Sequence, residues 1–300
     1  MHLITIITKI FHFLPEEIAH RFALSGLRIV YASGLLKILL GKKVKDSETL
    51  DNSFDKRVYK NKLGIAAGLD KDGEYIDSLA ALGIGFIEVG TVTPLQQSGN
   101  PKPRLFRNKT DKSLLNRLGF NNKGVEALVE NLKKRKSTIP IGVSIGKNFD
   151  TPNKEAYKDY LFCMEKVYEY SSYIAINISS PNTKGLRELS NDKFLRDLLG
   201  IIKDKQNKLS ETFEYVPIFI KISPDEEPKD LEKICNSITH YAIDGIIVSN
   251  TTVIHHDKNG YGGLSGSPLK NKADEKLSFI KKIVGDKISI IASGGVMSAS

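Results

Sequence analysis

The strongest constraint on the fold is an alternation, from residue 63 onward, between short apolar runs and longer amphipathic stretches. The apolar runs are too short for helices, and most are rich in Ile and Val, which is typical of strands buried on both faces. They cover residues 63–67, 86–89, 139–145, 173–178, 216–222, 245–248 and 288–292. The stretches between them show helical spacing of apolar residues, as at 155–170, 192–209 and 229–241. This repetition predicts parallel βαβ units.

Both a doubly wound sheet and a (β/α)8 TIM barrel accommodate seven such strands. Polar residues follow at least six of the runs, at 70–71, 91, 147–148, 177–182, 249–251 and 293–295. A doubly wound sheet binds its ligand in one crevice, whereas a barrel assembles its site from many strand ends, so this distribution favours the barrel. The eighth β/α unit is missing before Ser300, and we therefore expect a fragment of a longer protein or a shortened barrel.

The chain divides into three segments. Residues 1–42 predict helices with a restart at 14–17, because proline is tolerated in a first helical turn and acids suit the positive end of a helix. Residues 43–62 are polar and predict a linker containing a short strand, and residues 63–300 form the α/β barrel. No run of about 18 apolar residues occurs, so no transmembrane helix is expected. The N-terminus also lacks the small-residue cleavage site of a signal peptide.

Composition narrows the class of partner. The net charge of +9 is compatible with a solvated Lys-rich surface, an anionic membrane or an anionic ligand. Basic residues are not interleaved with aromatic residues, so nucleic acid is not an expected partner. Cys163 and Cys235 form no CxxC pair and have no His at metal spacing, so neither a metal site nor a disulfide is expected.

Two segments that follow predicted strands carry candidate chemistry. Residues 177–183 read NISSPNT: they are turn formers, but their amides and hydroxyls also suit a flat heterocycle with imide groups. Residues 66–73 read AAGLDKDG, where small residues allow a ligand to approach the backbone and Lys71 can meet an anion. An ordinary strand-to-helix turn is the alternative for this second segment.

Lys221 lies within the apolar run 216–222, where a buried ammonium is costly unless it is paired. Such a cation would stabilise negative charge on a ligand bound inside the barrel, or alternatively it reaches water from the strand end. The glycine-rich segments 262–266 and 293–295 follow later in the chain, in the part of a barrel that usually holds a phosphate.

At seven places, in the same order, the sequence resembles the dihydroorotate dehydrogenase family. The matching segments are GLDKDGE at 68–74, EVGTVTP at 88–94, GNPKPRLFR at 99–107, NRLGFNN at 116–122, AINISSPNTKGLR at 175–187, SNTT at 249–252 and GGLSG at 262–266. The resemblance implies a TIM barrel that holds flavin mononucleotide (FMN). It implies oxidation of (S)-dihydroorotate to orotate in de novo pyrimidine (UMP) biosynthesis, with hydride transfer to N5 of FMN.

Two features resemble the membrane-associated, quinone-using class 2 of this family. Ser180 occupies the position of the catalytic base, where soluble relatives carry Cys, and residues 1–42 resemble paired helices that lie on the membrane and form a quinone tunnel. The resemblance implies a monomer bound peripherally to the cytoplasmic side of a bacterial membrane, with quinone as electron acceptor. Two alternatives remain open: a soluble class 1 enzyme that uses fumarate or NAD, and a catalytically dead barrel remnant.

The resemblance also implies roles for individual residues. Ser180 takes the C5 proton of dihydroorotate, and Thr183 and Phe120 lie beside the proton path. The residues implied to bind dihydroorotate are Lys71, Asn116, Arg117, Leu118, Gly119, Phe120, Asn177, Asn182, Asn250 and Thr251. The residues implied to bind FMN are Ala67, Gly68, Leu69, Asp70, Lys71, Thr91, Ser144, Asn177, Lys221, Ser249, Gly266 and Gly295. Ser144 stands where the bacterial pattern has Asn, and His20 and Arg107 match quinone-tunnel positions.

Overall fold

The protein is built around one curled parallel sheet. The computed structural model describes residues 11–40, 50–52, 55–59, 61–183, 185–190, 192–254 and 260–298. The sheet has seven strands, which are neighbours in chain order: β3 (Gly64–Ile65), β4 (Phe86–Val92), β7 (Ile141–Ile145), β8 (Tyr173–Asn177), β9 (Ile218–Lys221), β10 (Gly245–Val248) and β13 (Ser289–Ala292). Every described pairing between them is parallel. All seven predicted strands are confirmed, and the unreversed order agrees with a barrel and not with a doubly wound sheet.

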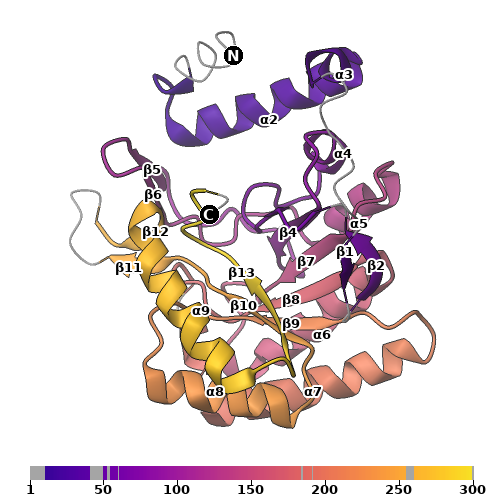
Figure 1. The fold of residues 1–300 in the computed structure, drawn as a ribbon, viewed down its shortest axis with the longest axis vertical. Coiled ribbons are helices and arrows are strands. Elements are labelled where there is room, and N and C mark those ends of the chain that lie inside the picture. The colour runs from indigo at the N-terminus through magenta and orange to yellow at the C-terminus, as the bar shows by residue number, and fades with distance from the viewer. Residues whose placement is uncertain are drawn as a thin grey trace.

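Helices alternate with the strands and cover the outside of the sheet (Figure 1). They are α4 (Ile76–Ala80), α5 (Val125–Lys134), α6 (Ala156–Val167), α7 (Asp192–Ser210), α8 (Pro228–His240) and α9 (Lys270–Val284). Short 3-10 turns are η2 (Asn153–Glu155), η3 (Tyr168–Tyr170), η4 (Leu186–Ser190) and η5 (Ser267–Leu269). Helical spacing explains their packing, since α5 buries Val125, Leu128, Val129 and Leu132 along one face. The predicted helices at 155–170, 192–209 and 229–241 are confirmed as α6 with η3, α7 and α8.

A second, antiparallel sheet was not predicted from the sequence. Its strands are ordered β11 (Thr252–Ile254), β12 (Gly262–Gly266), β6 (Ser113–Asn116) and β5 (Leu105–Asn108). In the segment predicted as a linker, β1 (Leu50–Asn52) pairs with β2 (Asp55–Tyr59) as an antiparallel hairpin. The short strand expected there therefore has a local partner.

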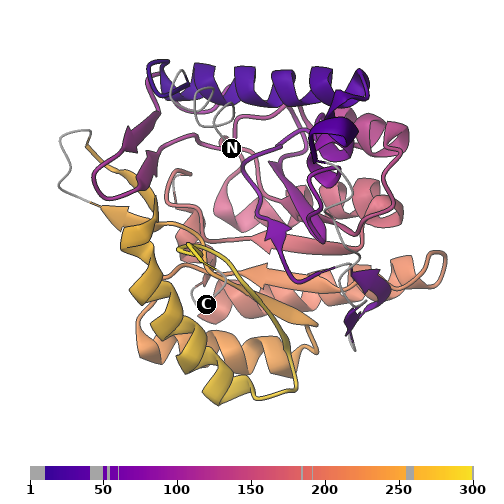
Figure 2. The same ribbon diagram turned by 45° about the horizontal axis from the view of Figure 1, so that its top comes forward.

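Two helices near the N-terminus lie across one end of the parallel sheet, as both views show (Figures 1 and 2). They are α2 (Glu16–Ala32) and α3 (Leu35–Leu40), and α2 begins at the predicted restart after Pro15. Between them the chain turns at Gly34, whose φ of +75° suits glycine. No helix in the described ranges is both long and apolar enough to cross a bilayer. The predicted helical residues 1–10 and 41–42 lie outside those ranges.

Aromatic rings fill the inside of the curled sheet. The Tyr173 ring lies 5.2 Å from the Phe219 ring and 6.5 Å from the Phe86 ring, measured between centroids. Glycines on neighbouring strands leave room for them, because a Cβ at Gly142 would lie 2.1 Å from the Tyr173 ring and one at Gly245 would lie 2.1 Å from the Phe219 ring. These rings form a packed layer inside the sheet, as is usual in a barrel.

Candidate active site

A cavity of about 840 Å³ lies between α2 and the carboxyl ends of the parallel strands. This volume is in the range of sites that bury a cofactor-sized ligand. Most of the predicted site residues line it: His20, Ala67, Gly68, Leu69, Asp70, Lys71, Thr91, Asn116, Leu118, Gly119, Phe120, Asn177, Ser180, Asn182, Lys221, Ser249, Asn250 and Thr251. Side chains separated by more than 200 residues in the sequence thus share one cavity.

A buried ion pair lies at the base of the cavity. The Lys221 ammonium Nζ donates to Glu88 Oε1 at 2.9 Å, and only 6% and 3% of the two side chains are exposed. The Tyr173 hydroxyl donates to Glu88 Oε2 at 3.1 Å. The backbone N–H of Ala67 also reaches Glu88 Oε1, at 3.4 Å, and so ties the pair to the glycine-containing loop after β3. Lys221 therefore faces the cavity as a paired and desolvated cation.

A network of amides and hydroxyls fixes the orientation of Asn177 at the end of β8. The Asn177 Nδ2 donates to Thr91 Oγ1 at 2.8 Å, and the Asn250 Nδ2 donates to Asn177 Oδ1 at 3.2 Å. Asn250 Nδ2 also donates to Ser179 Oγ at 3.1 Å. Thr91 shares a 2.9 Å hydroxyl–hydroxyl bond with Ser144, which is fully buried. The hydrogen-bond partners hold each amide in one orientation. The network therefore presents a fixed pattern of donors and acceptors to the cavity.

Ser180 lies on the cavity wall with 6% of its surface exposed. Its Oγ accepts the backbone N–H of Asn182 at 3.3 Å, and the Asn182 Nδ2 donates to Asn116 Oδ1 at 3.0 Å. Asn182 Oδ1 and Thr183 Oγ1 are buried without a hydrogen-bond partner among the residues that the structure describes. Buried polar atoms are rarely left unpaired in native proteins, so these two atoms point to a ligand or ordered water beside Ser180.

Titratable side chains of both signs line the end of the cavity beneath α2. Lys71 Nζ donates to Asn121 Oδ1 at 2.8 Å, and burial, followed by the charge of Arg104, lowers the pKa of Lys71 to about 7. Burial and the charge of Lys71 likewise hold the pKa of His20 below its ordinary value. Burial raises the pKa of Asp70 to about 6, and its carboxylate accepts the backbone N–H groups of residues 74 and 75. Asp70 thus braces the loop that carries Lys71.

An ion pair fastens α2 to the barrel. Arg104 Nη2 and Nε donate to the two carboxylate oxygens of Glu17 at 2.7 and 3.2 Å. Arg104 is buried, and its Nη1 donates to the backbone oxygens of Ser98 and Asn100. Burial opposes ionisation of Glu17, but the hydrogen bond and charge of Arg104 hold the pKa of Glu17 below its usual range.

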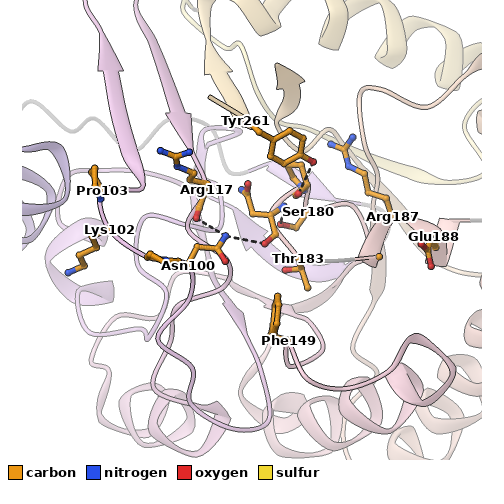
Figure 3. A pocket seen from close by; sticks show the side chains of 14 residues that line it. Asn100, Lys102, Pro103, Arg117, Phe149, Ser180, Thr183, Arg187, Glu188 and Tyr261 are labelled. Atoms are coloured by element: carbon orange, nitrogen blue, oxygen red, sulfur yellow. Dashed lines mark hydrogen bonds between the residues drawn. The ribbon is translucent and has the colours of Figure 1, made fainter. Parts of the chain in front are cut away.

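Six predicted residues lie outside this cavity. Arg117 and Thr183 line a second cavity on the other side of residues 180–182 (Figure 3). Ser144 lies behind Thr91, and Arg107 lies on β5, where its backbone N–H donates to Glu16. Gly266 and Gly295 pack against the chain itself, since added Cβ atoms would lie 2.3 Å from Lys112 O and 2.4 Å from Lys270 Cα. Packing therefore accounts for these two glycines without a ligand.

Several residues that shape the site were not singled out from the sequence. Glu88 gave the same signal as Lys221, because a charged residue within an apolar strand needs a partner. Asn121 and Arg104 lie within the segments that resemble the family. Nothing in the neighbouring sequence identifies Lys71 as the partner of Asn121 or Glu17 as the partner of Arg104. Gly294 lines the cavity, whereas its neighbour Gly295 does not.

Comparisons with known proteins agree with this geometry. A family model for dihydroorotate dehydrogenase matches residues 49–300. Two curated relatives are both called dihydroorotate dehydrogenase (quinone). The one from Buchnera aphidicola subsp. Schizaphis graminum is 47% identical, covering 98% of this chain and 88% of the relative. The one from Acinetobacter baylyi is 45% identical, covering 96% of this chain and 86% of the relative. The crystal structure of DHODH from Eimeria tenella in complex with ferulenol superposes with a TM-score of 0.80 at 32% identity, covering 94% of this chain and 80% of that one.

Proposed function

Because the chain belongs to the dihydroorotate dehydrogenase family, we propose that it oxidises (S)-dihydroorotate to orotate in pyrimidine biosynthesis and passes the electrons to a quinone. The observation that carries the proposal is the convergence of Asn177, Ser180, Asn182 and Lys221 on one buried cavity. The relatives' shared name supports the reaction and the acceptor.

The residues around the base of the cavity fit FMN. Gly68, with φ of +111° and no atom within 4 Å of an added Cβ, lets a planar ring approach the backbone. Lys221 and Asn177 supply a cation and an amide for the ring, and Ser249, Ser293 and Gly294 offer polar groups for the phosphate. Held by these residues, FMN would supply a hydride acceptor for C6 of dihydroorotate and a carrier of the electrons to the acceptor.

The amide cluster fits dihydroorotate, whose ring carries imide groups and a carboxylate. Asn116, Asn177, Asn182, Asn250 and Thr251 supply donors and acceptors for the ring, and Lys71 supplies a cation for the carboxylate. Since the ammonium of Lys71 is unpaired by any carboxylate in the described chain, an incoming anion stabilises its charged form.

Ser180 removes the C5 proton. A hydroxyl is a weak base, so it needs a dry pocket and a route by which the proton leaves. Ser180 is buried, Phe120 lines the same cavity, and the Thr183 hydroxyl, which has no partner among the described residues, lies toward the second cavity. Thr183 therefore offers a relay from Ser180 to solvent.

Substitution of Ser180 tests this mechanism. Ser180→Ala should retain bound flavin but slow the bleaching of the flavin by dihydroorotate by about 100-fold or more, in the range typical of a lost general base. The matched control is Ser210→Ala at the exposed end of α7, which should bleach at the normal rate. Bleaching of the Ser180→Ala protein at the normal rate would remove Ser180 from the mechanism.

The quinone side involves α2. The helix exposes Ile18, Phe22 and Ile29 while it buries Ala19 and Leu24 against the barrel. His20 and Arg28 lie at the cavity edge of the same helix. Such a helix suits peripheral binding to the cytoplasmic face of a bacterial membrane, with quinone entering beneath α2 toward His20. Arg107 on β5 lies beside the start of α2 and borders this entry.

The same proposal extends to the wider organisation of the chain. Residues 1–42 form the membrane and quinone segment, residues 43–62 join it to the barrel, and residues 63–300 form the FMN-binding barrel of a monomer. The strand order supports a (β/α)8 barrel, in which an eighth strand between β13 and β3 would complete the closure.

A soluble class 1 enzyme that uses fumarate or NAD is the second candidate, since the substrate site alone does not select the acceptor. Ser180 and the apolar outer face of α2 favour quinone. Turnover with a water-soluble quinone analogue, compared with fumarate and NAD at equal concentration, distinguishes them. Flavin absorbance that dihydroorotate fails to bleach would instead support a catalytically dead barrel.

A further inference from the structure

A second cavity lies on the outer side of the segment that carries Ser180. It also has a volume of about 840 Å³ and is open to solvent. Ser180, Pro181 and Asn182 line both cavities, so these three residues are the partition between them. Figure 3 shows Arg117, Arg187 and Tyr261 around this outer cavity, with Ser180 at its inner wall.

The charges of the outer cavity are mostly positive. Its lining includes Lys102, Arg117 and Arg187 against one carboxylate, that of Glu188. Arg187 pairs with Asp225 at 2.9 Å, and Asp225 also pairs with Lys272. Lys102 lies 3.4 Å from Glu17, which already pairs with Arg104 at 2.7 Å.

Arg117 differs from the other two cations. Its guanidinium stacks over the Phe106 ring, with the Cζ atom 5.0 Å from the ring centroid. A neutral aromatic ring holds the guanidinium in place without cancelling its charge, and no carboxylate in the described part of the chain forms an ion pair with it. The charge of Arg117 is therefore directed at ligands in the outer cavity more fully than that of Arg187.

The two cavities suit different molecules. The cavity beneath α2 is roofed by a helix whose outer face is apolar, whereas the outer cavity opens to water and holds the cations Lys102, Arg117 and Arg187 among apolar side chains. Dihydroorotate and orotate are carboxylate anions. A concave surface with a positive potential raises the local concentration of such anions and their rate of association.

We propose that the outer cavity is the capture vestibule for the anionic substrate and product, with Arg117 as the steering cation. Arg117 thus acts on the approach of the anion and not on the bound ligand, which lies across the partition. The outward carbonyls of the partition are tied to the vestibule walls, because Tyr261 donates to Pro181 O at 3.0 Å and Asn100 donates to Asn182 O at 3.3 Å. An anion that arrives here meets the residues that must shift to admit it.

This inference rests on the proposed function and is tested with the flavin-loaded protein. Orotate is mixed with it in a stopped-flow instrument at low and high salt, and the change in flavin absorbance gives the association and dissociation rates. Arg117→Gln should slow association at low salt about 3- to 10-fold, and Arg117→Glu should slow it further. The three proteins should converge at high salt, with nearly equal dissociation rates.

Lys282→Glu, exposed at the far end of α9, reverses one charge outside the vestibule and should leave the association rate unchanged. Association that is insensitive to salt and to Arg117→Glu would overturn the vestibule. An effect confined to dissociation would overturn it too, since it would make Arg117 a ligand of the bound anion. If the unaltered protein does not bind orotate at all, both the proposed function and the vestibule are contradicted.

Discussion

Removal of Glu88 tests the energetic role of the buried ion pair. The Lys221 Nζ and Glu88 Oε1 atoms are 2.9 Å apart, and both side chains are almost fully buried. Removing one partner of such a pair typically costs about 3–5 kcal/mol, because the other charge remains desolvated and uncompensated. Glu88→Gln keeps an oxygen for Lys221 and places its amide N–H beside the Tyr173 hydroxyl, which can accept it, so we expect the lower end of that range, about 3 kcal/mol. This is a large part of the roughly 5–15 kcal/mol that stabilises a typical domain.

Removing both charges should be less harmful than removing one. In the double variant Glu88→Gln with Lys221→Met, no ion remains in the apolar interior, and we expect at least half of the lost stability to return. Urea unfolding of flavin-stripped protein measures this without a contribution from flavin affinity. Glu155→Gln, which breaks the exposed Lys158–Glu155 pair, should leave the midpoint unchanged. The reasoning fails if Glu88→Gln is as stable as the unaltered protein, or if the double variant is less stable than the single one.

Two further predictions concern charge and membrane binding. The pKa of Lys71 is lowered to about 7 by burial and then by Arg104, so its ammonium is lost above that pH. Titrations should show orotate affinity falling by up to about tenfold per pH unit above pH 7, and Lys71→Met should bind weakly and remove this slope. The unfolded chain holds the proton up to its ordinary pKa of about 10.4, so this group should make the flavin-free protein more stable as pH rises between the two values. Phe22→Glu with Ile29→Glu should reduce vesicle binding by about 100-fold in a flotation assay, because inserting these two exposed apolar side chains into the bilayer is worth about 3 kcal/mol or more. The control Phe194→Glu on α7 should float normally.

The parallel sheet could be predicted because each strand is an uninterrupted apolar run buried on both faces. The antiparallel sheet could not, since its strands are three to five residues long and mix polar with apolar side chains. Its central pairing joins Asn116 to Gly263, and neither segment carries a local sequence signal for a partner so distant in the chain. Long-range pairing of short strands depends on where the barrel carries them.

The site was predictable where chemistry is written into one segment. The segment around Ser180 was identified from its amides and hydroxyls, and Lys221 from the cost of a buried ammonium. The partner of Lys221 depends on the registers of non-adjacent strands, so Glu88 could not be chosen from among the other carboxylates. Thr183 and Arg117 are neighbours of cavity residues in the sequence, but the backbone turns both toward the outer cavity. Proximity in the sequence therefore did not determine on which side of the partition, residues 180–182, a side chain lies.

The attachment of α2 through Glu17 and Arg104 constrains how the protein can be re-engineered for work in aqueous solution. A truncation that removes α2 would remove the outward apolar residues. It would also leave the Arg104 guanidinium without the Glu17 carboxylate and expose the cavity beneath α2 to solvent. Detergent-free handling is better sought by replacing the outward side chains one at a time while Glu17 is retained.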